Sequence, residues 1–468
     1  LALHAQEQGE RLFMPSDSAA QSVDSDALEQ AEQAFLQGVM HFTHEEIAMA
    51  ISALDESLSL NPLGMEARLL RGICHLKTGD VKKAGNDFDL YVNGDVDKCE
   101  NLNVVGKLLY MYGFFEDAEG KFRQALNLNA QDPVVHSNLG SVLIESRRWK
   151  EAEACFLKAM EIDPEFADAY ENLGILYFIT EDFSAAETVF LRAIELNEAA
   201  EIKDSLPYAN LGDLYFATGY TSACIDAYET ALGIEPEMSS LRTRLGMAWQ
   251  MKGEADLARD QFELAISYGN EPPEAHSQLA QFLVREGRIF EAISEYRRAI
   301  QVSQHKDPEI LIELGTILVR MERMEEALAL FQEAYRLGDQ SPAVLGSLSR
   351  LFELTGREEE SKDYFVRLMQ QDRESILVLI EIAQRCADSR IEGIFDPAAA
   401  VRIGDQIATD MGWYSPGVMR IMARAYEQLG DHAKAVKAQQ HVIASIPEST
   451  PLTHSMRSRL EEYLLRME

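Results

Sequence analysis

The sequence lacks any long uninterrupted run of apolar residues. A membrane-spanning helix needs about 18 to 20 consecutive apolar residues, and no stretch of the 468-residue chain approaches that length, although 46% of its residues are hydrophobic. We therefore expect these residues to form a buried core in a soluble protein.

Cysteine is scarce and scattered. The five cysteines are Cys74, Cys99, Cys155, Cys224 and Cys386, and no two of them form a C-x-x-C pair. An odd, dispersed set argues against a disulfide framework. The cysteines are therefore predicted to act as small buried hydrophobic residues.

Basic residues are few relative to acidic ones. The chain has 43 Lys and Arg against 78 Asp and Glu, a formal net charge of −35. A field of this sign disfavours nucleic acid and anionic membranes as partners, because phosphate groups are held by Lys and Arg. Basic or apolar partners fit better. Alternatively, the acidic residues only cover solvated helix faces and keep a long molecule soluble.

Motifs of catalysis and cofactor binding are also absent. The chain contains no H-E-x-x-H, G-x-S-x-G, Walker A or G-x-G-x-x-G pattern. His41 and His44 have Glu45 and Glu46 beside them, but they fall at an expected turn, where exposed polar residues are ordinary. We expect no enzymatic activity, no cofactor, no metal and no small-molecule substrate.

The sequence does contain a repeat. Asn138-Leu139-Gly140 is matched by Asn172-Leu173-Gly174 at an offset of 34 residues, and such a period indicates an array of stacked units. The first copy carries the pattern at Leu139, Gly140, Ala152, Phe156, Ala159 and Pro164. This pattern resembles the tetratricopeptide repeat (TPR) family. The resemblance implies an all-α fold, a right-handed α-solenoid of helix-turn-helix units that hold partner proteins.

The 34-residue spacing predicts about twelve units and a C-terminal capping helix. Residues 1–26 are read as a flexible leader, 27–449 as the array and 450–468 as the cap. The units are expected to start near Ala31, Met65, Cys99, Pro133, Ala167, Ser205, Ser239, Pro273, Pro308, Pro342, Ile376 and Pro416. Extra residues at 200–204 and at 389–397 interrupt the spacing. Loops of this kind often carry specificity.

Within each unit the glycine of the first helix is expected to face the small residue of the second. The expected pairs are Gly72 with Ala84, Gly106 with Ala118, Gly140 with Ala152, Gly174 with Ala186, Gly212 with Cys224, Gly246 with Ala258 and Gly315 with Ala327. The segment Asp396-Pro397-Ala398-Ala399-Ala400-Val401 resembles one in the closing units of certain bacterial TPR proteins, which suggests a bacterial source.

The residue before each Leu-Gly pair forms a row of predicted binding residues. In a TPR solenoid the first helices line the concave groove, and the row reads Asn138, Asn172, Asn210, Arg244 and Gln278. An amide both donates and accepts, so three amides in a row can hold an extended peptide independently of its sequence. The row resembles the asparagine ladder in the TPR groove of O-linked N-acetylglucosamine transferases. Alternatively, each amide bonds only to its neighbour.

Two further sets of side chains complete the predicted groove. Ile175, Phe178 and Phe216 form a candidate apolar floor, or else pack between adjacent units. Arg244, Arg285, Arg320 and Arg350 form a candidate positive island for carboxylate or phosphate groups. Alternatively, nearby Glu313 and Glu353 neutralise these arginines.

The sequence therefore predicts a scaffold or adaptor whose concave groove binds an extended segment or helix of one or more partner proteins. One alternative is a structural subunit of a large or membrane-associated assembly, held through its convex face. Another is the regulatory region of an enzyme whose catalytic part precedes Leu1. The opening residues, 1–6, resemble the end of a secretory signal. Because no basic region or full apolar region accompanies them, a cytoplasmic location is favoured, and export stays open.

Overall fold

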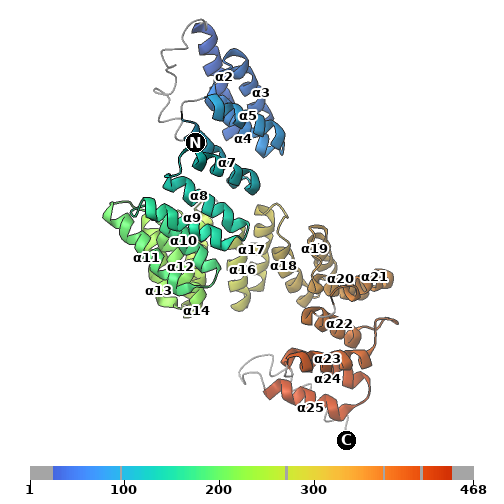
Figure 1. Ribbon diagram of the computed structural model, residues 1–468. Coiled ribbons are helices and arrows are strands. Elements are labelled where there is room, and N and C mark those ends of the chain that lie inside the picture. The colour runs from blue at the N-terminus through green and yellow to red at the C-terminus, as the bar shows by residue number, and fades with distance from the viewer. Residues whose placement is uncertain (1–24, 95–96, 269–271, 373–374, 412–414, 445–468) are drawn as a thin grey trace. The chain divides into compact units, whose positions relative to one another are not determined.

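The computed structural model describes residues 25–94, 97–268, 272–372, 375–411 and 415–444. Within these ranges the chain forms 24 α-helices and no strand. Each odd-numbered helix packs most closely on the helix before it, so the helices form twelve hairpins, each with a first and a second helix (Figure 1). The predicted all-α array of about twelve helical repeats is confirmed. No helix in these ranges is long and apolar enough to cross a membrane.

The chain divides into two compact units. Unit 1 spans residues 1–236 and unit 2 spans residues 237–468. The helices of unit 1 are α2 (Ser25–Thr43), α3 (Ile47–Leu60), α4 (Met65–Lys77), α5 (Val81–Gly94), α6 (Lys98–Met111), α7 (Phe115–Leu128), α8 (Pro133–Glu145), α9 (Trp149–Ile162), α10 (Ala167–Ile179), α11 (Phe183–Ala199), α12 (Leu206–Thr218) and α13 (Thr221–Ile234). The helices of unit 2 are α14 (Ser239–Lys252), α15 (Ala255–Ser267), α16 (Pro273–Arg285), α17 (Ile289–Val302), α18 (Pro308–Arg320), α19 (Met324–Arg336), α20 (Pro342–Leu354), α21 (Glu358–Met369), α22 (Ile376–Asp388), α23 (Pro397–Met411), α24 (Pro416–Gln428) and α25 (His432–Ala444).

The repeat boundaries follow the predicted spacing closely from the second hairpin onward. The first hairpin differs, because α2 begins at Ser25, before both the expected repeat start at Ala31 and the expected end of the leader at residue 26. Residues 1–24 of the predicted leader and the whole predicted capping helix, 450–468, lie outside the described residues.

Both interruptions of the spacing fall where the sequence places them. The first lengthens α11 to 17 residues, against 14 for α9, and adds a turn at residues 200–205. The second is the segment 389–396 between α22 and α23. There Asp396 caps α23, because its Oδ1 accepts a hydrogen bond from the N–H of Ala399 at 2.8 Å.

Proline and glycine mark the helix ends. Five first helices, α8, α16, α18, α20 and α24, begin with proline at a position where its missing N–H costs nothing. Many hairpin turns place a glycine at positive φ, such as Gly79 at 78° and Gly430 at 74°. Glycine adopts this conformation without strain because it has no Cβ.

In seven of the first helices a glycine packs against an aromatic ring. A Cβ on Gly140 would lie 2.5 Å from Cε1 of Phe156, a ring with 0% exposure. The atoms nearest to the missing Cβ therefore belong to the ring and not to the expected small residue, because the ring fills this space. The same contact joins Gly72 to Phe88, Gly106 to Phe122, Gly174 to Phe190, Gly212 to Tyr228, Gly246 to Phe262 and Gly315 to Phe331.

Successive first helices also contact one another within each unit. These contacts join α2 to α4, α6 to α8, α8 to α10 and α10 to α12 in unit 1, and α14 to α16, α20 to α22 and α22 to α24 in unit 2. No comparable contact joins successive second helices among the described residues. The first helices therefore occupy the more crowded side of each unit, which we call the first-helix side.

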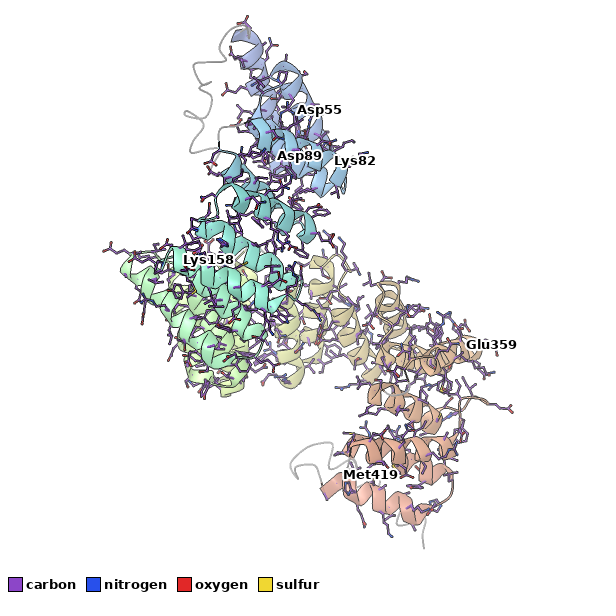
Figure 2. All side chains as sticks on the ribbon, viewed as in Figure 1. Asp55, Lys82, Asp89, Lys158, Glu359 and Met419 are labelled. Atoms are coloured by element: carbon purple, nitrogen blue, oxygen red, sulfur yellow. The ribbon has the colours of Figure 1, made fainter. Side chains whose placement is uncertain are left out.

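Charged side chains cover the second helices. Figure 2 labels Asp89 on α5, Lys158 on α9 and Glu359 on α21. Many of these charges form ion pairs within one helix or between neighbouring second helices, such as Lys121 with Asp89 at 2.7 Å. Exposed pairs of this kind contribute little to stability, about 0 to 1 kcal/mol each, so we attribute the fold mainly to the apolar core.

Candidate functional site

The predicted amide row links successive repeats of unit 1. Nδ2 of Asn138 donates to Oδ1 of Asn103 at 2.8 Å, and Nδ2 of Asn172 donates to Oγ of Ser137 at 3.0 Å. Nδ2 of Asn210 donates to Oε1 of Glu171 at 2.8 Å. Each partner lies on the preceding first helix, one residue before the position in that helix that is equivalent to the asparagine. The alternative of a bond to the neighbouring repeat therefore holds for all three amides.

These hydrogen bonds leave the amide oxygens available. Asn138, Asn172 and Asn210 are half-buried, and within the described part of the chain no donor reaches their Oδ1 atoms. An amide held by one hydrogen bond has a fixed orientation, so each oxygen is a pre-oriented acceptor.

Asn210 bonds to a carboxyl group with a strongly shifted pKa. Burial first, and then the carboxylates of Asp204 and Asp168, raise the pKa of Glu171 to about 7, while the hydrogen bond from Asn210 lowers it. Asn197 also donates to this acidic group, with Nδ2 at 3.1 Å from Oδ2 of Asp204. The end of the amide row therefore lies beside one carboxyl group, that of Glu171, whose pKa is close to neutral.

The predicted apolar floor is partly internal. Phe178 packs with its ring centre 6.0 Å from that of Phe183 in the same repeat. Ile175 and Phe178 both contact a buried cluster that includes Leu211 of the next repeat. The alternative of packing between units is thus supported for these two residues. Phe216 is half-buried.

A row of apolar side chains continues the candidate floor along the same helices, and the sequence reading named none of its members on α6 and α8. Met111 at the end of α6 is 73% exposed, and Ile179 at the end of α10 is 45% exposed. Tyr110 and Ile144, at the position of Phe178 in their own repeats, are half-buried. The repeat spacing carried this signal, because Ile179 directly follows Phe178 and Met111 directly follows Tyr110.

A cavity of about 290 Å³ lies beside the 200–204 insertion in unit 1. Its lining residues are Ile194, Asn197, Glu198, Glu201, Ile202, Lys203, Asp204, Pro207, Tyr208 and Ile234. Tyr208 closes one part of it by donating its hydroxyl to Oε1 of Glu198 at 2.8 Å. The insertion thus creates a hollow at this edge.

In unit 2 other residue types replace asparagine at the position of the amide row. Arg244 is exposed and Gln278 is half-buried. The next residue in the row is Glu313, whose Oε2 accepts from Oγ of Ser277 at 3.4 Å, and whose Oε1 accepts from Nε2 of Gln281 at 2.7 Å. The link between successive first helices therefore persists in unit 2 with a carboxylate in place of the amide.

The four predicted groove arginines separate in the structure. Arg285 and Arg320 are exposed at the ends of α16 and α18. Arg350 instead lines a cavity of about 190 Å³ together with Arg420 and Arg424. The other lining residues are Gln384, Asp388 and Ile421. The structure thus groups Arg350 with two arginines of the last repeat that the sequence reading did not name, although Arg424 stands at the same helix position as Arg350.

Glu353, expected to neutralise the groove arginines, is engaged elsewhere. Its Oε2 accepts from Nη2 of buried Arg385 at 2.7 Å and from Oγ of Ser389 at 3.0 Å, and its Oε1 accepts from the N–H of Arg390 at 2.6 Å. Burial raises the pKa of Glu353, but these hydrogen bonds outweigh it and hold the pKa below its ordinary value. Glu353 therefore fastens the 389–396 segment to repeat ten.

The same region holds a second carboxyl group, that of Glu381, whose pKa is raised and not lowered. Burial raises the pKa of Glu381 to about 7, although the charges of Arg350 and Arg385 lower it. A Cβ on Gly346 would lie 2.4 Å from Oε2 of Glu381. Glycine at this position therefore makes room for the carboxyl group against α20.

Three of the five thiols are buried, and His41 and His44 have hydrogen-bond partners. Cys74, Cys224 and Cys386 are buried, and burial raises the pKa of each thiol to about 11. Nδ1 of His41 lies 2.6 Å from Oε2 of Glu46, and Nδ1 of His44 lies 2.7 Å from the carbonyl of Met40. No group of three or more His, Cys, Asp or Glu side chains in these ranges is arranged to hold a metal ion.

Some solved structures resemble parts of the chain. Pseudomonas aeruginosa pilF is 15% identical to this chain, and the match covers 45% of this chain and 94% of pilF, with a TM-score of 0.39. YrrB, described as a TPR protein with an unusual peptide-binding site, is 20% identical over 39% of this chain and 91% of its own, with a TM-score of 0.32. Human IFIT1 with PPP-AAAA is 14% identical over 74% of this chain and 94% of its own, with a TM-score of 0.43. No curated protein sequence matches the chain.

Sequence models of one family match both units. Three models described as tetratricopeptide repeats match residues 132–199, residues 35–95 and 277–342, and residues 207–238 and 421–449. Together these matches span more than half of the chain. Repeats of this family typically form non-catalytic scaffolds for protein interactions. The chain therefore belongs to the tetratricopeptide repeat family and has the architecture of a protein-interaction scaffold.

Proposed function

We propose that the protein is an interaction scaffold that binds an extended segment or an amphipathic helix of a partner protein along the first-helix side of unit 1. The observation that carries this proposal is the row of partly exposed apolar side chains on successive first helices. Tyr110 and Met111, Ile144, Phe178 and Ile179, and Phe216 belong to this row.

The apolar row and the amide row supply complementary contacts. Exposed side chains such as Met111 and Ile179 offer apolar surface that a partner would bury. The free Oδ1 atoms of Asn138, Asn172 and Asn210 supply acceptors for the N–H groups of an extended chain. An apolar surface with regularly spaced acceptors suits a peptide better than a flat protein surface.

The net charge of the chain limits which kinds of partner segment it can attract. A net charge of −35 attracts basic segments and repels acidic polymers. The carboxyl groups of Glu171 and Asp204 stand at the end of the amide row. A partner segment with apolar side chains and Lys or Arg residues therefore fits unit 1.

Site-specific crosslinking in the native host tests which side of unit 1 meets a partner. A photoreactive amino acid at Ile179 is compared with one at Leu191, because the two residues have similar exposure, 45% and 43%, and lie on the first and second helix of one repeat. We expect a crosslinked partner, identified by mass spectrometry, from position 179 and not from position 191.

Charge substitutions test the energetic contribution of the row. Met111→Glu combined with Ile179→Glu is expected to reduce recovery of the crosslinked partner by about tenfold or more, since buried apolar anchors contribute about 2 kcal/mol or more to interfaces. Leu157→Glu with Leu191→Glu is the control on the second helices. Equal loss in both variants, or loss only in the control, would contradict binding along the first helices.

One observation favours a second candidate function. Leu157 is 48% exposed and Leu191 is 43% exposed at equivalent positions of successive second helices, α9 and α11. A structural subunit held through its second helices would use this surface. Crosslinks from position 191 in the same experiment would support that alternative.

A further inference from the structure

Three arginines line one cavity in the last three repeats of unit 2. Arg350 comes from α20, and Arg420 and Arg424 come from α24. Gln384 and Asp388 on α22 and Ile421 on α24 complete the lining of about 190 Å³. Since α22 contacts both α20 and α24, the cavity belongs to three packed first helices and not to a mobile surface loop.

The cavity has an excess of positive charge. Nη1 of Arg424 donates to both carboxylate oxygens of Asp388, at 2.6 and 2.7 Å. Arg350 and Arg420 are exposed, and within the described ranges no carboxylate forms an ion pair with either guanidinium. Two cations without an ion-pair partner in these ranges therefore share one hollow, although the charge of Arg350 also acts on the carboxyl group of Glu381, whose pKa is raised to about 7.

The shape of these groups indicates the ligand chemistry. A guanidinium is a planar fork of N–H donors that matches the two oxygens of a carboxylate. A cavity of about 190 Å³ holds roughly six water-sized groups at about 30 Å³ each, which is the size of an Asp or Glu side chain. The amide of Gln384 offers a further donor, and Ile421 offers an apolar contact for the side-chain methylenes.

The surroundings disfavour larger or more highly charged anions. Asp388 lies on the wall of the cavity, and its charge opposes a group with two negative charges. The net charge of the whole chain also repels polyanions such as nucleic acid.

We propose that this cavity binds an acidic side chain, Asp or Glu, of a partner peptide, with Arg350 and Arg420 donating to its carboxylate. The proposal goes beyond the proposed function, because it concerns unit 2 and needs none of the residues of the row in unit 1. Substitutions at Met111 and Ile179 leave the cavity intact, so either proposal can fail alone.

Selection from a library of random peptides tests this proposal. The peptides are displayed with their C-termini fused, so that only side-chain carboxylates are offered, and the full chain is the immobilised target. We expect Asp or Glu to be enriched at a fixed position. This enrichment is expected to vanish when the target carries Arg350→Gln and Arg420→Gln.

The most enriched peptide is then synthesised and its affinity is measured by fluorescence anisotropy. Each single variant, R350Q or R420Q, is expected to weaken binding by about tenfold or more, the range for a lost hydrogen bond to a charged group. Replacing the enriched acid by its amide in the peptide should cause a similar loss and should remove the effect of the variants. Arg350→Lys keeps the charge but lacks the fork, and it should recover only part of the affinity.

Arg285 and Arg320 supply the matched control. Both are exposed arginines on first helices of unit 2, and neither lines the cavity. R285Q with R320Q should leave the affinity unchanged. Three results overturn the proposal: no enrichment of acidic residues, equal binding by the R350Q/R420Q target, or equal loss in the R285Q/R320Q control. Competition by millimolar inorganic phosphate at constant ionic strength would identify a phosphate site instead.

Discussion

Glu381→Gln is expected to stabilise repeats ten and eleven, and more so as the pH rises. Burial raises the pKa of this carboxyl group from 4.5 to about 7, and the charges that act on it, Arg350 on α20 and Arg385 on α22, only partly offset that effect. The folded chain therefore keeps a proton that the unfolded chain releases. Glutamine is the isosteric neutral replacement and cannot ionise.

The sign and magnitude follow from proton linkage. Between pH 4.5 and 7 the folded state binds more protons at this position than the unfolded state, so stability falls as the pH rises. Each pKa unit corresponds to about 1.4 kcal/mol, which gives a loss of about 3 kcal/mol by pH 7 and above. The E381Q variant is free of this loss. The free energy of unfolding of E381Q should therefore exceed that of the wild type by an amount that grows from pH 4.5 to pH 7 and then levels off.

Local hydrogen exchange is the suitable assay, because repeat arrays open in parts and not as one cooperative unit. Amides of α20 and α22 are followed by mass spectrometry at several pH values, after correction for the intrinsic pH dependence of exchange. We expect slower exchange in E381Q than in the wild type at pH 8, and little difference at pH 4.5.

Glu353→Gln supplies a control of opposite sign in the neighbouring repeat. The pKa of Glu353 lies below its ordinary value, so its contribution to stability is present above pH 4.5 and is lost as the pH falls through the folded-state pKa. E353Q also leaves buried Arg385 without its carboxylate, which should speed exchange at neutral pH. If E381Q exchanges as fast as the wild type at pH 8, or if both variants respond to pH with the same sign, the reasoning is refuted.

Further predictions concern the glycine contacts and the amide row. Gly140→Ala is expected to destabilise its repeat by about 1 to 3 kcal/mol, because the added Cβ meets the buried ring of Phe156. Gly120→Ala, in open space within α7, should instead stabilise the repeat that contains α7 by up to about 1 kcal/mol. Local hydrogen exchange measures both effects. Asn172→Ala with Asn210→Ala is expected to weaken capture of the unit 1 partner by about tenfold without unfolding the array. Calorimetry with the crosslinked segment of that partner measures the loss, and unchanged affinity would remove the amides from the proposed site.

The amino-acid sequence alone predicted the fold and most repeat boundaries. A period of 34 residues, with Leu139 and Gly140 repeated as Leu173 and Gly174, requires only local helix and turn preferences to be recognised. The prolines at the helix starts and the insertions near residues 200 and 390 were visible for the same reason. The start of α2 was placed too late, because no proline or glycine marks it.

Contacts between repeats could not be predicted in this way. The sequence placed Asn138, Asn172 and Asn210 in a row, but only the packing of successive first helices shows that each amide donates to the preceding repeat. Their assignment as peptide-binding residues stays a prediction. Likewise, the spacing aligned each glycine with a small residue, whereas the packed hairpin brings an aromatic ring against it.

The arginine cavity shows most clearly the difference between what the sequence predicts and what only the tertiary structure shows. Arg350, Gln384 and Arg424 are each the ninth residue of α20, α22 and α24, but the repeat spacing does not show that Arg420 and Asp388 join them. Their proximity depends on how three first helices pack and on which carboxylates are already occupied, as Glu353 is by Arg385. The sequence by itself determined a tetratricopeptide array with a strong negative charge. Only the tertiary structure decided where that array leaves positive charge uncompensated, because ion pairing depends on distances between repeats that no local pattern encodes.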